Sequence, residues 1–254
     1  MDGDHPSARL GGRVRDELRQ RSAVPDRLSS VVTDSVPSTA PGEMLLCFAR
    51  ADPDERGAAE RGADGAMEAA VAVEFAALHQ YLHAIPVASA PLADPARDSP
   101  YADDEVAAII DGDWLQAAAF ARVAGSTSSA GAARRCHAAL SGGSTRCYEL
   151  WERSNEAADP APIAPLIGAA GRIGAIVAGL DRSAGATVAD VARSIGAAVP
   201  IRTPAGTGAG TATTPPSRSS LVEDLSGVVG DPERVVDELE RLASGDSALE
   251  VVDS

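Results

Sequence analysis

The sequence predicts an all-α protein built around a single helical domain, and three observations lead to this prediction. The 254 residues are 44% apolar but only 3% aromatic. Alanine and glycine are abundant, which favours closely packed helices over a sheet rich in valine and tyrosine. Long apolar stretches are bounded by proline, glycine and charged residues, with no internal repeat and no alternating pattern typical of strands.

The first half of the chain predicts three helical regions. Residues 9–35 predict an amphipathic helix or helix pair, divided at Pro25 because proline interrupts a helix interior. Residues 42–50 are short and apolar and favour helix over strand. Residues 66–85 give the clearest helix, because apolar side chains surround the whole cylinder, as in a buried central helix. Pro86 is expected to end it.

The second half predicts further helices separated by short breaks. After a proline-bearing loop, Asp103 or Asp104 is expected to cap a helix that runs to about residue 124. A capping box formed by Thr187 and Asp190 is expected to start a later helix. The helices predicted after the break at residues 125–131 cover residues 132–141, 145–156, 160–180, 187–199 and 232–243.

Changes in composition predict how the chain is divided. Residues 1–204 are expected to form the helical domain, and residues 205–220, rich in Gly, Thr, Pro and Ser, a flexible linker. Residues 221–254 are expected to form a last helix and an acidic tail. Within the helical domain, three glycines leave a smooth face for close helix packing: Gly168, Gly171 and Gly174.

The charge is strongly acidic, and it limits the possible partners. The formal net charge is −15, and all 22 basic residues are arginine. Such a surface suggests a halophilic protein, because salt screens its self-repulsion; an acidic protein from a GC-rich genome is the alternative. A negative surface argues against nucleic acid as a partner.

Cysteine usage and the N-terminus predict a cytoplasmic protein. The three cysteines, Cys47, Cys136 and Cys147, are widely spaced and lack CxxC spacing. They predict neither a disulfide framework nor a zinc site, which fits a reducing compartment. The N-terminus is acidic and polar, and no uncharged apolar run is long enough to span a membrane. We therefore expect no secretory signal and no membrane span.

Four segments within residues 10–204 are informative together: AVAVEFAALHQYLH, DGDWLQAAAF, PIAPLIGAAGRIGAIVAG and ARSIGAAVPIRTP. In their joint order and spacing they resemble signature helices of the trans-isoprenyl diphosphate synthases, the polyprenyl synthetase family. The resemblance implies the isoprenoid synthase fold. The matching residues are Glu74 and His83; Gly112, Asp113, Leu115 and Phe120; Leu166, Gly174, Ala175 and Gly179; Ile195 and Gly196.

The same resemblance implies a reaction whose metal ligands have no counterpart here. In the family an allylic diphosphate ionises while Mg²⁺, held by two Asp-rich motifs, stabilises the leaving diphosphate. The motif positions of this chain hold Ala84, Ile85 and Ala88 in the first motif, and Thr203, Pro204 and Thr207 in the second. No carboxylate stands at any of these positions, so we predict no metal site of this kind.

Other positions of the family pattern, including its basic diphosphate-binding segment, are also replaced. Pro162 stands where the family has the lysine of KTxxL, and Val199 and Pro200 stand where it has a Phe-Gln pair. The basic diphosphate-gripping segment would fall near residues 36–46, which contain no Lys or Arg. Arg97 is the remaining candidate ligand-binding residue.

These replacements predict a pseudoenzyme with no catalytic residue and no cofactor. The retained helices would serve as a subunit or regulator that forms a homodimer or pairs with an active prenyl diphosphate synthase. An active prenyltransferase is the alternative, with Mg²⁺ held instead by Asp103, Asp104, Asp111 or Asp113. A third hypothesis is a carrier of an apolar ligand in a tunnel between the helices at 66–85 and 106–124.

Three weaker signals each lack a partner or a setting that a functional site would need. His79 and His83 lie four residues apart on one helix face, as a transition-metal site requires, but the sequence shows no third ligand nearby. The Cys136-His137 pair has no partner that would orient a nucleophile. The Gly-rich residues 205–210 lack the strand, helix and lysine of a phosphate loop.

Overall fold

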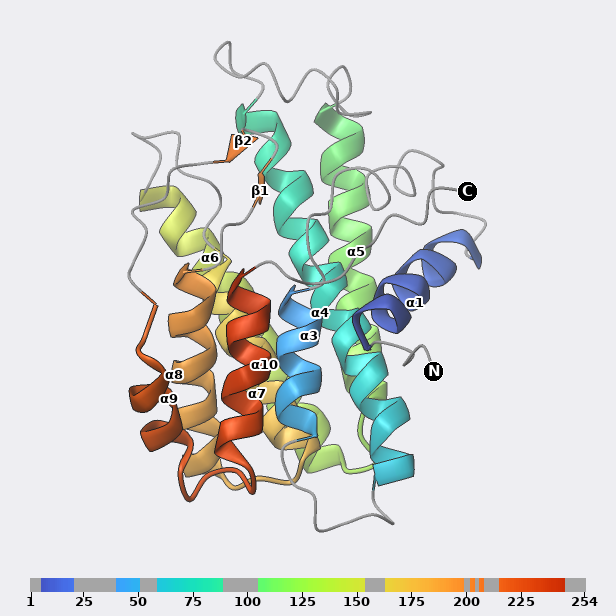
Figure 1. The fold of residues 1–254 in the computed structure, drawn as a ribbon. Coiled ribbons are helices and arrows are strands. Elements are labelled where there is room, and N and C mark those ends of the chain that lie inside the picture. Colours follow the sequence, from blue (N-terminus) through green and yellow to red (C-terminus); the bar gives the residue numbers. More distant parts are fainter. Residues whose placement is uncertain are drawn as a thin grey trace, which may run out of the picture.

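The computed structural model describes residues 6–20, 40–50, 59–88, 105–153, 163–198, 202–203, 206–207 and 215–244. These residues form a bundle of helices that mostly run side by side, with α1 crossing the edge of the bundle (Figure 1). The helices are α1 (Pro6–Gln20), α3 (Ala40–Ala49), α4 (Ala59–Ala88), α5 (Glu105–Gly125), α6 (Ala130–Arg153), α7 (Ala164–Val177), α8 (Arg182–Ala198), α9 (Arg218–Leu225) and α10 (Pro232–Ser244). The predicted all-α class is confirmed, although β1 (Arg202–Thr203) and β2 (Gly206–Thr207) form a small antiparallel pair.

The core lies around α3 and α4. Helix α3 packs against α4, α7 and α10, and its Leu45 and Phe48 are fully buried. Helix α4 is buried on nearly all sides between residues 69 and 76, which confirms the central helix predicted there. It continues to Ala88, so the predicted end at Pro86 is wrong. Proline removes one N–H donor and crowds the carbonyl four residues earlier, so the helix continues past Pro86 at some cost in stability.

The glycines of α7 allow its neighbours to approach closely, as the sequence predicts. A Cβ added to Gly174 would lie 2.5 Å from the Leu45 carbonyl oxygen of α3. A Cβ added to Gly171 would lie 2.6 Å from the Cβ of Ala192 in α8. Real Cβ atoms do not approach other atoms this closely, so any side chain at these positions would push the helices apart.

Helix α6 is one continuous helix, whereas the sequence predicts two with a break near its glycines. Gly143 lies within this helix, and a Cβ there would meet the Cβ of Ala169 in α7 at 2.7 Å. Glycine is a weak helix former in isolation, but here its lack of a side chain lets α6 pack directly on α7. Tertiary packing therefore outweighs the local preference.

Helix α8 begins earlier than the capping pattern predicts. Asp181 caps the helix, because its Oδ1 accepts a hydrogen bond from the Ala184 N–H at 2.9 Å. Thr187 lies inside the helix, and its hydroxyl donates to the Ser183 carbonyl at 3.4 Å. The predicted capping box at Thr187 and Asp190 is therefore wrong, since a better N-cap stands at Asp181.

Helix α9 begins within the range predicted to be a linker. Ser217 caps it by accepting a hydrogen bond from the Ser220 N–H at 3.3 Å. Leu221 and Leu225 are buried in the common core, and α9 contacts α8 and α10. Residues 208–214 lie outside the described residues, and the division of the chain into three parts stays a prediction. The amphipathic helix predicted at 232–243 is confirmed as α10.

An ion-pair network fastens α1 to α4 and α5. The Arg122 guanidinium of α5 contacts Glu17 of α1 and Glu68 of α4, and only 10% of its side chain is exposed. Arg13 adds contacts to Glu68 at 3.0 Å and to Glu17 at 3.3 Å. Arg122 also lies over the Phe75 ring, 5.5 Å from its centroid. The short helix α1 is thus held by charge as well as by its apolar face.

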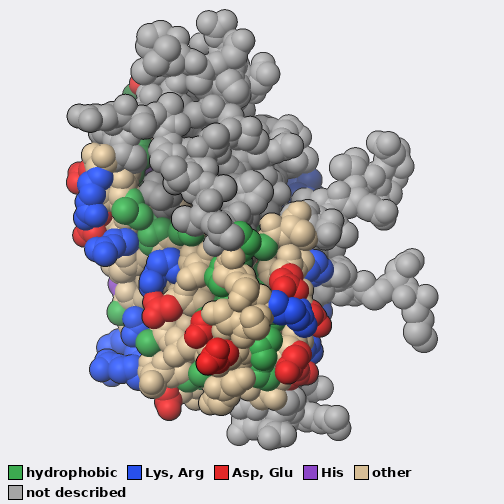
Figure 2. Space-filling view, turned by 60° about the vertical axis from the view of Figure 1, so that its left-hand side comes forward, with side chains coloured by type: hydrophobic (Ala, Val, Ile, Leu, Met, Phe, Trp, Pro, Cys, Tyr) green, Lys and Arg blue, Asp and Glu red, His purple; other side chains and the backbone are tan. Residues whose placement is uncertain are grey.

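The surface carries mixed charges. Figure 2 shows Arg side chains interspersed with Asp and Glu over the described part of the face that includes α8 and α9. Within the described ranges, none of the helices combines the length and the apolar character needed to cross a membrane.

Candidate functional site

A cluster of polar side chains joins α4, α5 and α6. His79 and His83 of α4 have ring centroids 4.2 Å apart. The Tyr148 hydroxyl of α6 lies 2.7 Å from His79 Nε2 and 3.2 Å from His83 Nδ1. Asp113 Oδ1 of α5 lies 3.2 Å from His83 Nε2. The helical register predicts the two histidines as a pair, and the fold adds one polar group from each neighbouring helix.

Hydrogen bonding fixes the protonation of His79. Its Nδ1 lies 2.9 Å from the carbonyl oxygen of Gly112, which only accepts, so Nδ1 carries the proton. Burial, reinforced by nearby His83, lowers the pKa of His79 to about 4, so the ring is neutral at pH 7. Its Nε2 is therefore an acceptor. Burial also raises the pKa of Tyr148 to about 12, so the hydroxyl stays protonated at pH 7. It therefore donates a hydrogen bond to His79 Nε2.

Gly112 lets the two imidazoles lie directly against α5. A Cβ at this position would meet His83 Cδ2 at 2.5 Å and His83 Nε2 at 2.9 Å. The glycine thus makes room for the rings while its carbonyl orients His79. Gly112, Asp113 and His83 all match the family pattern, and the structure brings them together. Glu74, another matching residue, lies apart from them, buried beside α3.

Other family-matching residues have packing roles. A Cβ at Gly196 of α8 would meet the Ile167 side chain of α7 at 2.8 Å. Gly179 has a φ of 82°, a left-handed conformation that suits glycine and ends α7, with the Leu180 N–H bonded to the Ala175 carbonyl. With Gly174, these residues hold the helices in their arrangement.

Several predicted site positions lie at the edges of the described structure. Ala84, Ile85 and Ala88 belong to the end of α4, and Thr203 and Thr207 belong to β1 and β2. Outside the described residues lie Arg97, Asp103, Asp104, Pro162, Val199, Pro200 and Pro204. The predicted ligand-binding role of Arg97 therefore stays a prediction.

Asp111 and Asp113 do not converge on one site. Asp111 is buried, with 5% of its surface exposed, whereas 65% of the Asp113 side chain is exposed. Two residues apart on a helix, they point in nearly opposite directions. This arrangement does not favour the alternative in which they jointly hold Mg²⁺.

The cysteines are buried and carry free thiols. Burial raises the pKa of Cys136 to about 11 and that of Cys147 to about 12, and burial also raises the pKa of Cys47. A thiol is nucleophilic as the thiolate, which these sites disfavour near neutral pH. Cys136 therefore gains no nucleophilic character from its neighbour His137.

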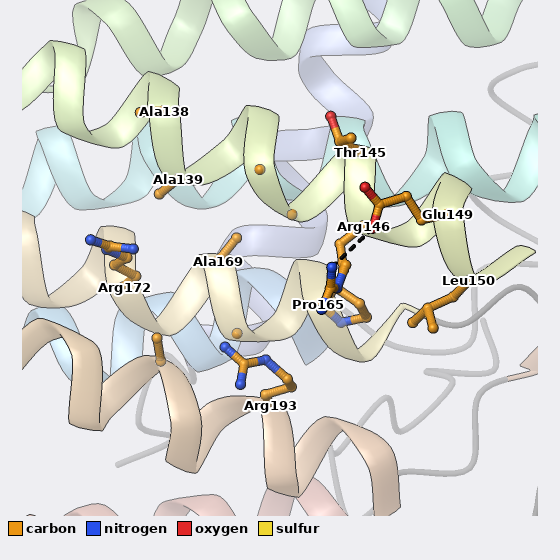
Figure 3. Close-up of a pocket in the computed structure, with 14 residues that line it drawn as sticks. Ala138, Ala139, Thr145, Arg146, Glu149, Leu150, Pro165, Ala169, Arg172 and Arg193 are labelled. Carbon is orange, nitrogen blue, oxygen red and sulfur yellow. Dashed lines mark hydrogen bonds and ion pairs between the residues drawn. The ribbon is translucent and has the colours of Figure 1, made fainter.

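A pocket with a volume of about 660 Å³ opens between α6, α7 and α8. Figure 3 shows Arg146 of α6 and Arg193 of α8 pointing toward α7, whose Pro165 and Ala169 also line the pocket. Arg146 pairs with Glu149 at 3.0 Å, and Arg193 pairs with Asp190 at 2.8 Å. Sequence reasoning did not find this pocket, because it depends on glycines and alanines meeting across three helices. Glu149 and Asp190 thus neutralise the charge of two arginines that line the pocket.

The chain has the isoprenoid synthase fold. Among solved structures, it is similar to an FPP/GFPP synthase from Zymomonas mobilis, with a TM-score of 0.63 and 16% identity over 92% of this chain and 95% of the other. A geranyltransferase from Helicobacter pylori, complexed with magnesium and isoprenyl diphosphate, gives a TM-score of 0.64 and 13% identity over 93% and 95%. A geranylgeranyl pyrophosphate synthetase from the archaeon Geoglobus acetivorans gives a TM-score of 0.59 and 17% identity over 94% of this chain and 83% of the other. No protein-family model and no curated protein matches the sequence.

Proposed function

We propose that the protein is a non-catalytic relative of the polyprenyl diphosphate synthases that serves as a subunit or regulator of an active synthase. The observation that carries the proposal is a contrast between two sets of matching positions. The packing glycines Gly112, Gly174 and Gly196 are kept, and each stands where a Cβ would clash. The positions that match the Asp-rich motifs hold no carboxylate.

The chemistry explains why this contrast matters. The Helicobacter pylori geranyltransferase structure contains magnesium and isoprenyl diphosphate. A departing diphosphate builds up negative charge, and Mg²⁺ that stabilises it needs hard oxygen ligands from the protein. Removing a single group that stabilises such charge costs about two to three orders of magnitude in rate. Replacement of every motif carboxylate by Ala, Ile, Thr or Pro therefore supports a protein without condensation activity.

An apolar patch on α5 supports association with another protein. Val106 is 65% exposed, Ile109 is 41% exposed and Ile110 is 60% exposed. Large aliphatic side chains grouped in this way are typical of interaction surfaces. We propose that an active prenyl diphosphate synthase of the same organism binds here, and a second copy of this chain is the competing occupant.

Replacing Ile110 with arginine tests this surface. The variant should bind the cognate synthase at least about tenfold more weakly, because a central apolar contact is lost and a charge is desolvated. Isothermal titration calorimetry measures the affinity, and light scattering separates the heterodimer from a homodimer. The control is Ala186→Arg, the same type of change at an exposed position on α8, which should bind like the wild type. The partner assignment fails if the wild-type chain does not bind the synthase.

A further inference from the structure

We propose that His79, His83 and Asp113 form a binding site for a divalent transition-metal cation of the zinc type. One ligand atom from each residue can be chosen so that all three lie within 4.8 Å of one another. The site lies between α4 and α5 and uses none of the positions that match the aspartates of the two Asp-rich motifs. The proposal is independent of whether the chain binds a synthase.

The geometry of the two histidines suits metal binding. They stand four residues apart on α4, so both rings project from the same face. The Nδ1–H of His79 donates to the Gly112 carbonyl, so the Nε2 lone pair faces the cluster, where it accepts from the Tyr148 hydroxyl at 2.7 Å. Metal binding would replace this hydrogen bond, and the Tyr148 hydroxyl would turn away from His79. A hydrogen bond from the second ring nitrogen to a backbone carbonyl is the usual way in which a metal-binding histidine is oriented.

Counting protons shows why a cation fits between His83 and Asp113. Tyr148 has one hydroxyl proton, which it donates to His79 Nε2, so its oxygen accepts from His83 Nδ1–H. In a neutral His83 the remaining Nε2 is then a lone pair, facing Asp113 Oδ1 at 3.2 Å. This Nε2 is buried and makes no hydrogen bond within the described part of the chain. A metal ion would bind both acceptors, His83 Nε2 and Asp113 Oδ1. The competing explanation for their closeness is a proton on His83 Nε2.

The donor set selects the class of metal. Two imidazole nitrogens and one carboxylate suit zinc and its neighbours, whereas Mg²⁺ prefers oxygen ligands throughout. Three protein ligands would leave one position of a tetrahedral site for water. This position can face solvent, because Asp113 is largely exposed. The ion would tie the second half of α4 to α5.

The test measures Zn²⁺ binding to the full-length chain, freed of any affinity tag and stripped with a chelator. Isothermal titration calorimetry should show one equivalent bound, and the melting temperature should rise by a few degrees. His83→Gln and Asp113→Asn should each weaken binding at least about tenfold, since a ligand is lost. Asp113 is exposed, so its variant should fold normally, as circular dichroism would verify. In the control, His137→Gln, the exposed histidine of α6 is changed and binding should persist.

Two results would overturn the proposal. One is the absence of saturable Zn²⁺ binding by the wild-type chain, which would leave the cluster as a hydrogen-bonded network with a proton on His83. The other is binding that Asp113→Asn and His83→Gln leave unchanged, which would place the ion elsewhere. Co²⁺ provides an independent readout, because its visible absorption should appear with the wild type and be lost in both variants.

Discussion

Replacing Gly174 with alanine is expected to lower the free energy of unfolding by about 3 kcal/mol, at the upper end of the usual cost of overpacking. The added Cβ would lie 2.5 Å from the Leu45 carbonyl oxygen and 3.1 Å from the Phe48 Cβ. The nearest atom belongs to the backbone of α3, so relief requires movement of the whole helix rather than of one side chain. Urea unfolding of the variant and the wild type measures the difference.

Gly142→Ala is the matched control for this substitution. Gly142 lies within α6, and nothing lies within 4 Å of a Cβ built on it. Alanine should therefore stabilise the protein there by about 0.5 to 1 kcal/mol, because glycine is the poorer helix former. A Gly174→Ala variant as stable as the wild type would show that α3 and α7 do not approach as closely as described.

Replacing Glu74 with glutamine is expected to stabilise the protein at pH 8 by a few kcal/mol and to change little at pH 4.5 or below. Burial raises the pKa of Glu74 to about 8, helped by the charge of Glu43 and opposed by the hydrogen bond from the Gly42 N–H. That bond measures 2.6 Å, and glutamine can accept it through its amide oxygen. The variant thus keeps the contact and removes the titration.

The sign of the pH effect follows from the two pKa values. The unfolded chain loses the Glu74 proton near pH 4.5, whereas the folded chain keeps it to about pH 8. The stability of the wild type is therefore complete below pH 4.5 and falls as the pH rises to 8, by up to about 1.4 kcal/mol per pH unit. Denaturant unfolding at pH 4.5, 6 and 8 should show this decline in the wild type and a flatter profile in Glu74→Gln.

The control for the pH effect is Glu152→Gln, the same chemical change at an exposed position of α6. Its stability should follow the wild-type profile. If Glu74→Gln is instead less stable than the wild type at pH 8, the carboxylate is ionised in the folded state and held by the first turn of α3. That result would contradict the pKa assigned to this residue.

The sequence predicted those helices whose formation depends on the pattern of apolar residues and glycines within the helix itself. The buried central helix α4 and the amphipathic helix α10 follow from the pattern of apolar residues, and the close packing of α7 follows from its glycines. The start of α9 could not be predicted, because Leu221 and Leu225 reveal their role only when they meet α8 and α10. The continuity of α6 likewise depends on Gly143 packing against α7.

The candidate site likewise contains residues that the sequence could bring together and residues that it could not. His79 and His83 are paired by the helical repeat, so the sequence suffices to bring them together. Asp113 and Tyr148 come from other helices, and no local pattern predicts their distances to the histidines.

The most direct test is a condensation assay with the purified chain alone. Isopentenyl diphosphate and an allylic diphosphate are incubated with Mg²⁺ at high salt, and prenyl products are extracted and quantified. We expect no product above the protein-free control, while the cognate synthase forms product under the same conditions. Magnesium-dependent product formation by the lone chain would contradict the account, because it would require metal ligands beyond the positions that match the Asp-rich motifs.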